Sequence, residues 1–153
     1  MIRNGFLATL LLAVSLLTSA PVAADQTLEL ENYRGKVVLL DFWASWCVPC
    51  RRSFPWMNEM QQKYADAGLV IIAVNLDNDA AEAATFLKEY PAQFEIAYDT
   101  DKQLARSYNV QAMPTSYLLD RDGATIERHL GFKSAKTDEY EAAIVAALKG
   151  AAE

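Results

Sequence analysis

Cysteine and histidine are scarce in this sequence, which holds two cysteines and one histidine among 153 residues. Two cysteines exclude a disulfide-rich scaffold, because such a scaffold needs several bridges in a short chain. Together with His129 they are also a thin supply for a zinc site, so we expect no metal and no other cofactor. Positive charge is in deficit too, since the formal net charge is -6 at pH 7. That balance excludes the basic surface with which proteins bind nucleic acid.

The sequence also lacks internal repeats, low-complexity tracts and linkers. Apolar residues make up 52% of it, which excludes a disordered chain. A length of 153 residues is enough for one domain with a sizeable core, but not for two. We therefore expect a single domain, and we expect it to be a monomer.

The first 24 residues have the pattern of a secretory signal peptide. Arg3 supplies a positive start, residues 6–17 form an apolar stretch, and a Val-Ala-Ala sequence of small residues precedes Asp25. We expect cleavage before Asp25, which leaves the domain in residues 25–153. An uncleaved membrane anchor is the alternative, although the apolar run is short for the ~20 residues that span a bilayer. Either reading places the domain outside the cytoplasm, in the periplasm or another exported location, where disulfides can form.

Strand and helix patterns alternate along the rest of the chain. Residues 37–43 and 69–74 are nearly continuous apolar runs, which is typical of strands covered on both faces. Between them, apolar residues spaced by three or four predict a helix that starts at Pro49, is kinked at Pro55 and is capped by Gly68.

The second half of the chain continues this alternation. Its expected elements are a helix over 79–89, a short strand over 94–98, a short helix over 101–108, hairpin strands over 115–119 and 124–128 around a turn at 121–123, and a last helix that carries Tyr140 and Leu148. This order predicts an α/β fold with a mixed central sheet flanked by helices.

The two cysteines stand where the first strand pattern gives way to the helix. The free amide groups and partial positive charge of a helix N-terminus favour a thiolate, so Cys47 is predicted to be a nucleophile at the exposed mouth of the first turn. Cys50, three residues later, is close enough to attack a mixed disulfide at Cys47. A purely structural bridge is the alternative, but so small a ring constrains the unfolded chain little. We therefore predict a redox-active Cys47–Cys50 disulfide.

Asp41 is the one acid in the apolar run over residues 37–43. Burial of a lone carboxylate is costly, so its pKa is predicted to be raised. A buried carboxyl near Cys50 could accept the proton of that thiol when it becomes a nucleophile. The alternative is an acid that faces solvent at a strand edge.

These residues resemble those of thioredoxin. The segment Trp-Ala-Ser-Trp-Cys-Val-Pro-Cys at 43–50 is similar to its active-site signature, and Asp41 occupies the place of its buried aspartate. Pro55 matches its helix-kinking proline. The resemblance implies a thioredoxin fold in which Pro114 is cis and faces the dithiol. Met113 and Thr115 would then offer backbone groups to an extended substrate.

Two further residues complete the expected substrate surface. Trp46 is interpreted as an exposed aromatic rim for the substrate, and Pro49 is placed beside it. His129 lies in a strand pattern and is interpreted as structural.

Within the thioredoxin superfamily, the chain is similar to exported TlpA/ResA-like thiol–disulfide reductases. The similarity rests on residues 35–40, on the signal, and on a helix–strand insert at about 77–98 between the two halves of the fold. It implies a protein-disulfide reductase whose clients are proteins with disulfides, with cytochrome c maturation as one candidate process and a membrane-bound electron donor. That group often has asparagine in place of Asp41 and glutamate in place of Ser53. This chain reverses the position of the acid, which favours thioredoxin-like proton chemistry.

Other functions with the same residues remain open. An oxidase or isomerase of the same fold is one alternative, because Val48 and Pro49 between the cysteines do not determine a reduction potential. A copper-carrying module is another, although related carriers use Cys-x-x-x-Cys with a histidine, and here the spacing is one residue short. A peroxidase is excluded, because Leu40 and Ala44 occupy the positions that its motif requires to be proline and threonine or serine.

Overall fold

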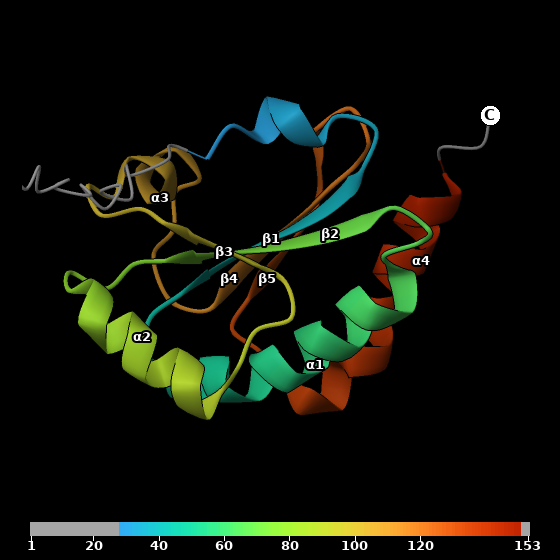
Figure 1. Ribbon diagram of the computed structural model, residues 1–153. Coiled ribbons are helices and arrows are strands. Elements are labelled where there is room, and N and C mark those ends of the chain that lie inside the picture. The colour runs from blue at the N-terminus through green and yellow to red at the C-terminus, as the bar shows by residue number, and fades with distance from the viewer. Residues whose placement is uncertain (1–27, 151–153) are drawn as a thin grey trace, which may run out of the picture.

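A five-stranded mixed sheet forms the centre of the computed structural model, which describes residues 28–150 (Figure 1). Its strand order is β3-β2-β1-β4-β5, with bounds β1 (Val37–Trp43), β2 (Leu69–Asn75), β3 (Glu95–Tyr98), β4 (Thr115–Leu119) and β5 (Thr125–Leu130). β1 pairs in parallel with β2 and antiparallel with β4, and β5 completes the hairpin. The predicted α/β fold with a mixed sheet is confirmed. The expected signal peptide lies outside the described residues.

Helices cover both faces of the sheet (Figure 1). One face carries α1 (Val48–Tyr64), α2 (Ala80–Glu89) and α4 (Thr137–Lys149), and the other carries the short helices η1 (Leu30–Tyr33) and α3 (Gln103–Ser107), while η2 (Ser134–Lys136) precedes α4. Every residue of β1 is buried, as its unbroken apolar pattern predicts for a central strand. β1 therefore separates two apolar cores and carries side chains into both of them.

Trp43 anchors the core on the α1 side of the sheet. Its ring centroid lies 4.9 Å from that of Phe54 and 4.8 Å from that of Phe86, so one residue each from β1, α1 and α2 meet there. Aromatic contacts of this kind add to the stabilisation that burial alone supplies. This cluster holds the end of β1 against the first turns of α1, where the two cysteines lie.

Element boundaries differ from the sequence prediction in a few places. α1 ends at Tyr64, and Gly68 closes the following turn with φ +102° instead of capping the helix. A Cβ at Gly68 would lie 3.0 Å from Nη1 of Arg121, so the position suits glycine on two grounds. The predicted cap of α2 is confirmed, since Asp79 accepts a hydrogen bond from the Ala81 amide at 2.9 Å.

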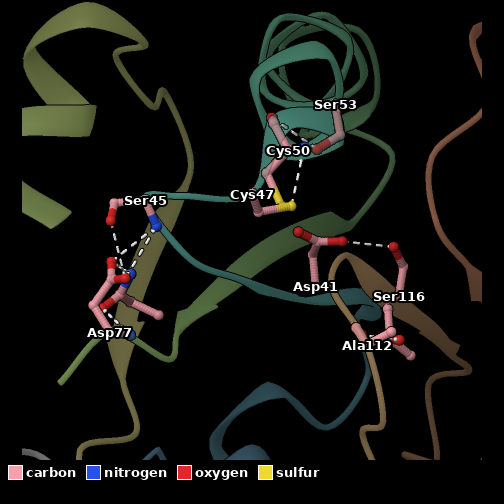
Figure 2. Close-up of a disulfide and its surroundings, with 10 residues drawn as sticks. Asp41, Ser45, Cys47, Cys50, Ser53, Asp77, Ala112 and Ser116 are labelled. Carbon is pink, nitrogen blue, oxygen red and sulfur yellow. Dashed lines mark hydrogen bonds between the residues drawn. A yellow bond between two sulfur atoms is a disulfide. The ribbon is translucent and has the colours of Figure 1, made fainter. Parts of the chain in front are cut away.

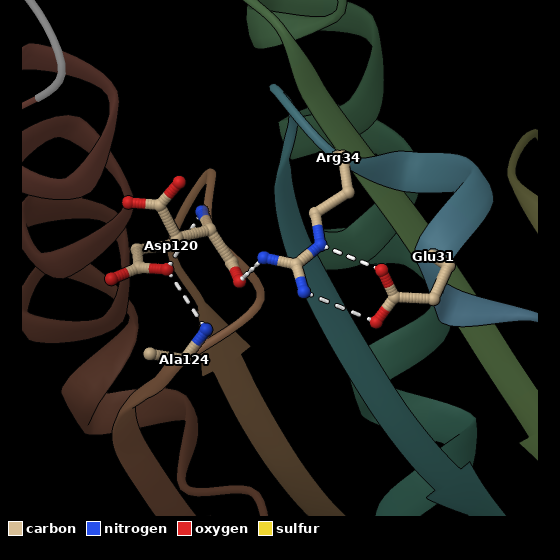
Figure 3. Close-up of polar contacts among 5 residues, drawn as sticks. Glu31, Arg34, Asp120 and Ala124 are labelled. Carbon is tan, nitrogen blue, oxygen red and sulfur yellow. Dashed lines mark hydrogen bonds and ion pairs between the residues drawn. The ribbon is translucent and has the colours of Figure 1, made fainter.

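The turn between β4 and β5 is held by polar contacts that also attach η1 (Figure 3). Asp120 accepts hydrogen bonds from the amides of Asp122 and Ala124, each at 2.9 Å, which is the usual way an aspartate stabilises a tight turn. Arg34 forms a two-point ion pair with Glu31 at 2.8 and 3.1 Å and also donates to the carbonyl of Asp122. Arg34 thus attaches η1 to the turn of the β4–β5 hairpin.

The segment expected to be an insert, residues 77–98, contains α2 and β3. β3 pairs in parallel with β2 and forms one edge of the sheet. That this segment is an insertion relative to thioredoxin stays a prediction. Within residues 28–150, none of the helices is both long enough and apolar enough to span a bilayer.

Candidate active site

The two cysteines form a disulfide at the N-terminus of α1 (Figure 2). Cys47 is the N-cap residue and Cys50 lies in the first turn, with a Cα–Cα distance of 5.3 Å. Pro49 also lies in that turn, where its missing amide hydrogen costs no helical bond. The backbone amide of Cys50 donates to Sγ of Cys47 at 3.3 Å. In the reduced protein the same donor would favour a thiolate at Cys47 over one at Cys50.

The prediction that Cys47 lies exposed at the mouth of the helix is wrong. It is 3% exposed and Cys50 is fully buried. Both belong to the core cluster that contains Trp43, and Met113 packs against the same cluster. The exposed residues around the disulfide are Trp46, at 64%, and Val48, at 57%. A protein that reaches Cys47 must therefore contact this apolar rim.

Asp41 lies on the same face of β1 as Leu39 and Trp43, because side chains alternate along a strand. Both neighbours belong to the cluster that holds the cysteines, and the Asp41 carboxyl points toward the disulfide (Figure 2). It is 1% exposed, so the alternative of a solvent-facing acid is wrong. Oδ1 accepts a hydrogen bond from Ser116 Oγ at 2.6 Å, whereas Oδ2 has no hydrogen-bond partner in the described residues.

Burial raises the pKa of Asp41 to about 7, and the hydrogen bond from Ser116 opposes that rise. The predicted direction of the shift is confirmed. A carboxyl with a pKa near neutrality can both accept and release a proton at physiological pH, which suits a general base. Its part in catalysis stays a prediction.

The segment before β4 has the predicted cis bond between Met113 and Pro114. Pro114 is buried, and its carbonyl accepts from the Gly131 amide at 2.8 Å. Thr115 is fully buried, and its hydroxyl donates to the carbonyl of Ala112 at 2.7 Å. β4 lies between β1 and β5, so strand-type pairing with a substrate would use Met113 before it uses Thr115. The contact of all three residues with a substrate stays a prediction.

Asp77 is a residue of this region whose role sequence reasoning missed. It is 4% exposed and lies just beyond β2. Its carboxylate accepts from the amide of Ser45 at 2.9 Å, from the Ser45 hydroxyl at 3.0 Å and from the side-chain amide of Asn75 at 2.8 Å (Figure 2). These bonds fix the loop that presents Trp46 and Cys47. The contact spans 32 residues, and no local pattern indicates it.

Replacement of Asp77 by alanine should loosen this loop. The variant leaves the Ser45 amide and the Asn75 side chain without their acceptor, so we expect a loss of about 2–4 kcal/mol in the free energy of unfolding. Urea denaturation measures it. Asp79→Ala is the matched control, because it removes one exposed cap and should cost only about 1 kcal/mol. Equal losses for the two variants would contradict the anchoring role of Asp77.

The remaining polar residues near the disulfide have surface or backbone roles. Arg51 and Arg52 are exposed on α1, and the buried Ser53 donates to the carbonyl of Cys50 at 3.1 Å. Among residues 28–150, no group of three or more histidine, cysteine, aspartate or glutamate side chains is placed to hold a metal ion.

Comparison with known proteins places this site in a family. The Redoxin family model matches residues 17–144. Thiol-disulfide oxidoreductase ResA of Bacillus cereus is 38% identical over 104 residues, which cover 68% of this chain and 60% of the relative. ResA of Bacillus subtilis (strain 168) is 34% identical over 100 residues, which cover 65% of this chain and 56% of the relative. The matches thus span less than two thirds of these curated relatives.

A solved structure shows the similarity over a larger share of the chain. The crystal structure of a Chlorobium tepidum protein, assigned as the thiol:disulfide interchange protein DsbE, is 50% identical with a TM-score of 0.77. The match covers 79% of this chain and 86% of that one. The chain therefore belongs to the Redoxin family, as a TlpA/ResA-like member of the thioredoxin superfamily.

Proposed function

We propose that this protein is an exported thiol–disulfide oxidoreductase that reduces disulfides of client proteins. The observation that carries the proposal is a Cys47–Cys50 disulfide at a helix N-terminus, with the buried carboxyl of Asp41 beneath it. A bridge that served only for stability would need neither a thiolate-favouring helix end nor a buried acid. The names of the ResA and DsbE relatives support the same chemistry.

The reaction proceeds in two exchanges. The Cys47 thiolate attacks one sulfur of the client disulfide, which forms a mixed disulfide and releases the other client sulfur as a thiolate. Asp41 then accepts the proton of the Cys50 thiol, and the Cys50 thiolate attacks Sγ of Cys47. This step closes the Cys47–Cys50 disulfide and releases the second client sulfur. Two electrons pass to the client, whose thiolates take up protons from solvent.

The reducing direction is supported by the buried carboxyl of Asp41, which has no cationic partner among the described residues and whose Oδ2 has no hydrogen-bond partner there. An ionised carboxylate beneath the dithiol repels a thiolate at Cys47 and so disfavours the charged reduced form. Strongly oxidising proteins of this kind owe their potential to the opposite effect, which is stabilisation of the reduced form. The buried acid therefore favours a reductase over an oxidase or isomerase.

Export and partners follow from the sequence. The signal-like residues 1–24 support a periplasmic or otherwise exported domain. Disulfides form outside the cytoplasm, so proteins with disulfides are available there as clients. Each turnover leaves the enzyme oxidised, so a reductant must restore the dithiol. We assign that role to a membrane-bound electron donor, and we assign the enzyme itself as a monomer.

Reduction of insulin by dithiothreitol tests the activity. The protein should accelerate the precipitation of the freed insulin chain, and Cys47→Ala should abolish the acceleration. A wild-type protein that does not accelerate the reaction, yet binds Cu(I) tightly in anaerobic titration of its reduced form, would replace the reductase with a copper carrier.

Trp46 should contribute to client binding. It is 64% exposed beside Cys47, and removal of an exposed aromatic contact from a protein interface costs about 1–2 kcal/mol. We expect Trp46→Ala to raise the KM for a protein disulfide about tenfold and to change kcat little. Ile126→Ala is the control, since Ile126 is 50% exposed on β5 at the edge of the sheet. An unchanged KM in Trp46→Ala would show that the client does not contact this rim.

A further inference from the structure

Three polar residues lie in a row across the sheet beneath the disulfide. Asp41 on β1 is the direct partner of Ser116 on β4, and Ser116 is the direct partner of His129 on β5. Directly opposed residues of neighbouring strands share a face, so all three side chains point to the side covered by α1 and α4. Ser116 already donates to Asp41 at 2.6 Å. The row runs from the fully buried carboxyl to the edge strand of the sheet.

A small cavity joins the second and third members of this row. It has a volume of about 20 Å³, and Ser116, His129, Trp56 and Tyr140 are among the residues that line it. A water molecule needs roughly 10–15 Å³ and at least two polar partners. The cavity therefore has room for one water, and Ser116 and His129, which both line it, can supply two polar partners.

His129 connects this cavity to the surface. Its side chain is 17% exposed, and its Nε2 lies 3.4 Å from Oε1 of Glu127 on the same strand. From α4, the ring of Tyr140 packs against it with a centroid distance of 4.5 Å. Lys136 from η2 and Glu139 from α4 also act on it electrostatically, and desolvation dominates these effects and lowers the pKa of His129. A neutral imidazole near solvent can accept a proton and then release it.

We propose that Ser116 and His129 form a proton relay between the buried Asp41 and solvent, with one water in the cavity between them. The inference rests on the proposed dithiol chemistry and gives a function to a histidine that the sequence pattern presents as structural. Ser116 and His129 do not touch the reacting sulfurs. They act through Asp41, as the route by which its proton leaves.

The transfer conserves protons and changes no oxidation state. When Asp41 is protonated, the Ser116 hydroxyl turns its hydrogen toward the water. Protonated Asp41 then passes its proton to Ser116 Oγ, the hydroxyl passes its own proton to the water, and the water passes one to His129. Ser116 is left donating to the Asp41 carboxylate, as in the structure. The imidazolium then releases a proton to solvent, and the neutral tautomer returns. Asp41 becomes a carboxylate, ready to accept the next proton from Cys50. Without this route, the apolar packing around Asp41 separates it from bulk water.

A pH jump on the oxidised protein tests the relay without any client. Time-resolved infrared spectroscopy follows the carboxyl C=O band of Asp41, assigned by its absence in Asp41→Asn, after a jump from about pH 6 to about pH 9. We expect His129→Gln to slow the loss of this band about tenfold, because a positioned proton acceptor accelerates transfer by at least that factor. His129→Phe, which keeps a ring against Tyr140, should slow it equally, and added imidazole should restore part of the rate.

The control is Arg128→Gln. Arg128 is next to His129 on β5, but its side chain points to the opposite face of the sheet and contacts the ring of Tyr117. Wild-type rates in both His129 variants would overturn the relay, and so would an equal slowing in the Arg128 control. The insulin assay is independent of this measurement. A failed relay with intact insulin reduction leaves the proposed function in place, and a failed insulin assay removes the proposed function whatever the infrared result.

Discussion

Cys50→Ala should accumulate mixed disulfides with client proteins at Cys47, close to one client chain per enzyme chain. In this variant Cys47 still attacks, but no thiol remains three residues away to close the Cys47–Cys50 bond and release the client. The amide of residue 50 is retained, so the donor that favours a thiolate at Cys47 is retained as well. Non-reducing gel electrophoresis of the protein isolated after expression of the full sequence measures the accumulation, and mass spectrometry identifies the clients.

Cys47→Ala is the matched control for this trap. Both variants lose the same disulfide, and closure of so short a ring contributes about 2 kcal/mol in either case. Their stabilities should therefore be similar, while only Cys50→Ala should carry clients. Mixed disulfides on Cys47→Ala at the same level would contradict the assignment of Cys47 as the attacking residue. Their absence from both variants would contradict the two-cysteine mechanism.

Asp41→Asn should stabilise the oxidised protein at neutral and alkaline pH while it slows catalysis. The pKa of Asp41 is raised from 3.8 to about 7 in the folded protein, so the folded state binds more protons than the unfolded state between these values. Stability of the wild type therefore falls as pH rises from about 4 to about 7, and then levels off. At about 1.4 kcal/mol per pKa unit, the fall is about 4 kcal/mol.

The asparagine variant lacks this titration, so its advantage over the wild type should be absent near pH 4 and complete above pH 7. Urea denaturation across this range measures the difference. Asp122→Asn controls for the loss of one negative charge, because Asp122 lies in the exposed turn between β4 and β5. A constant difference between Asp41→Asn and the wild type at all pH values would contradict a buried, titrating carboxyl.

Catalysis should change in the opposite direction. Without a carboxylate to accept the Cys50 proton, resolution of the mixed disulfide should slow by about 10²-fold or more at neutral pH. Release of the second thionitrobenzoate after addition of dithiobis(nitrobenzoate) measures this step, because the second release requires Cys50. Unchanged resolution would assign Asp41 a structural role.

The stability of the fold and the proton chemistry of Asp41 thus make opposite demands on one residue. Oδ2 lacks a hydrogen-bond partner in the described residues, although an acceptor or donor there would lower the cost of burial. Such a partner would also move the pKa of Asp41 away from neutrality, and a carboxyl serves best as a base when its pKa is close to the working pH. The cost is therefore consistent with a functional group retained at the expense of stability.

Much of the fold could be predicted from local pattern. The seven buried residues of β1 are continuous in the sequence, and the apolar spacing after Pro49 defines α1. These signals are strong because each kind of burial has its own apolar pattern. A strand covered on both faces needs a continuous apolar run, and a long helix with one buried face needs apolar residues three or four positions apart. Cys47, Cys50 and Asp41 could be predicted as candidate site residues because they differ chemically from the rest of these two elements.

The partners of these residues could not be predicted in the same way. Ser116 lies 75 residues from Asp41, and Asp77 lies 32 residues from Ser45. Each pairing depends on strand register and on loop placement, which only the assembled sheet determines. The wrong prediction about Cys47 has the same origin, because Cys47 is buried in a core cluster that residues distant in sequence build, and its position at a helix end does not reveal this.

The reduction potential of the Cys47–Cys50 pair is the measurement that tests the proposed function most directly. The protein is equilibrated in glutathione or dithiothreitol buffers, and the reduced fraction is followed by the fluorescence of its tryptophans, two of which flank the site. Thiol–disulfide proteins span about -270 to -120 mV, a range worth roughly 7 kcal/mol for two electrons. With the buried carboxyl of Asp41 beneath the dithiol, we expect a value near the reducing limit, at about -250 mV. A value near about -120 mV would contradict the reductase and make this protein an oxidase.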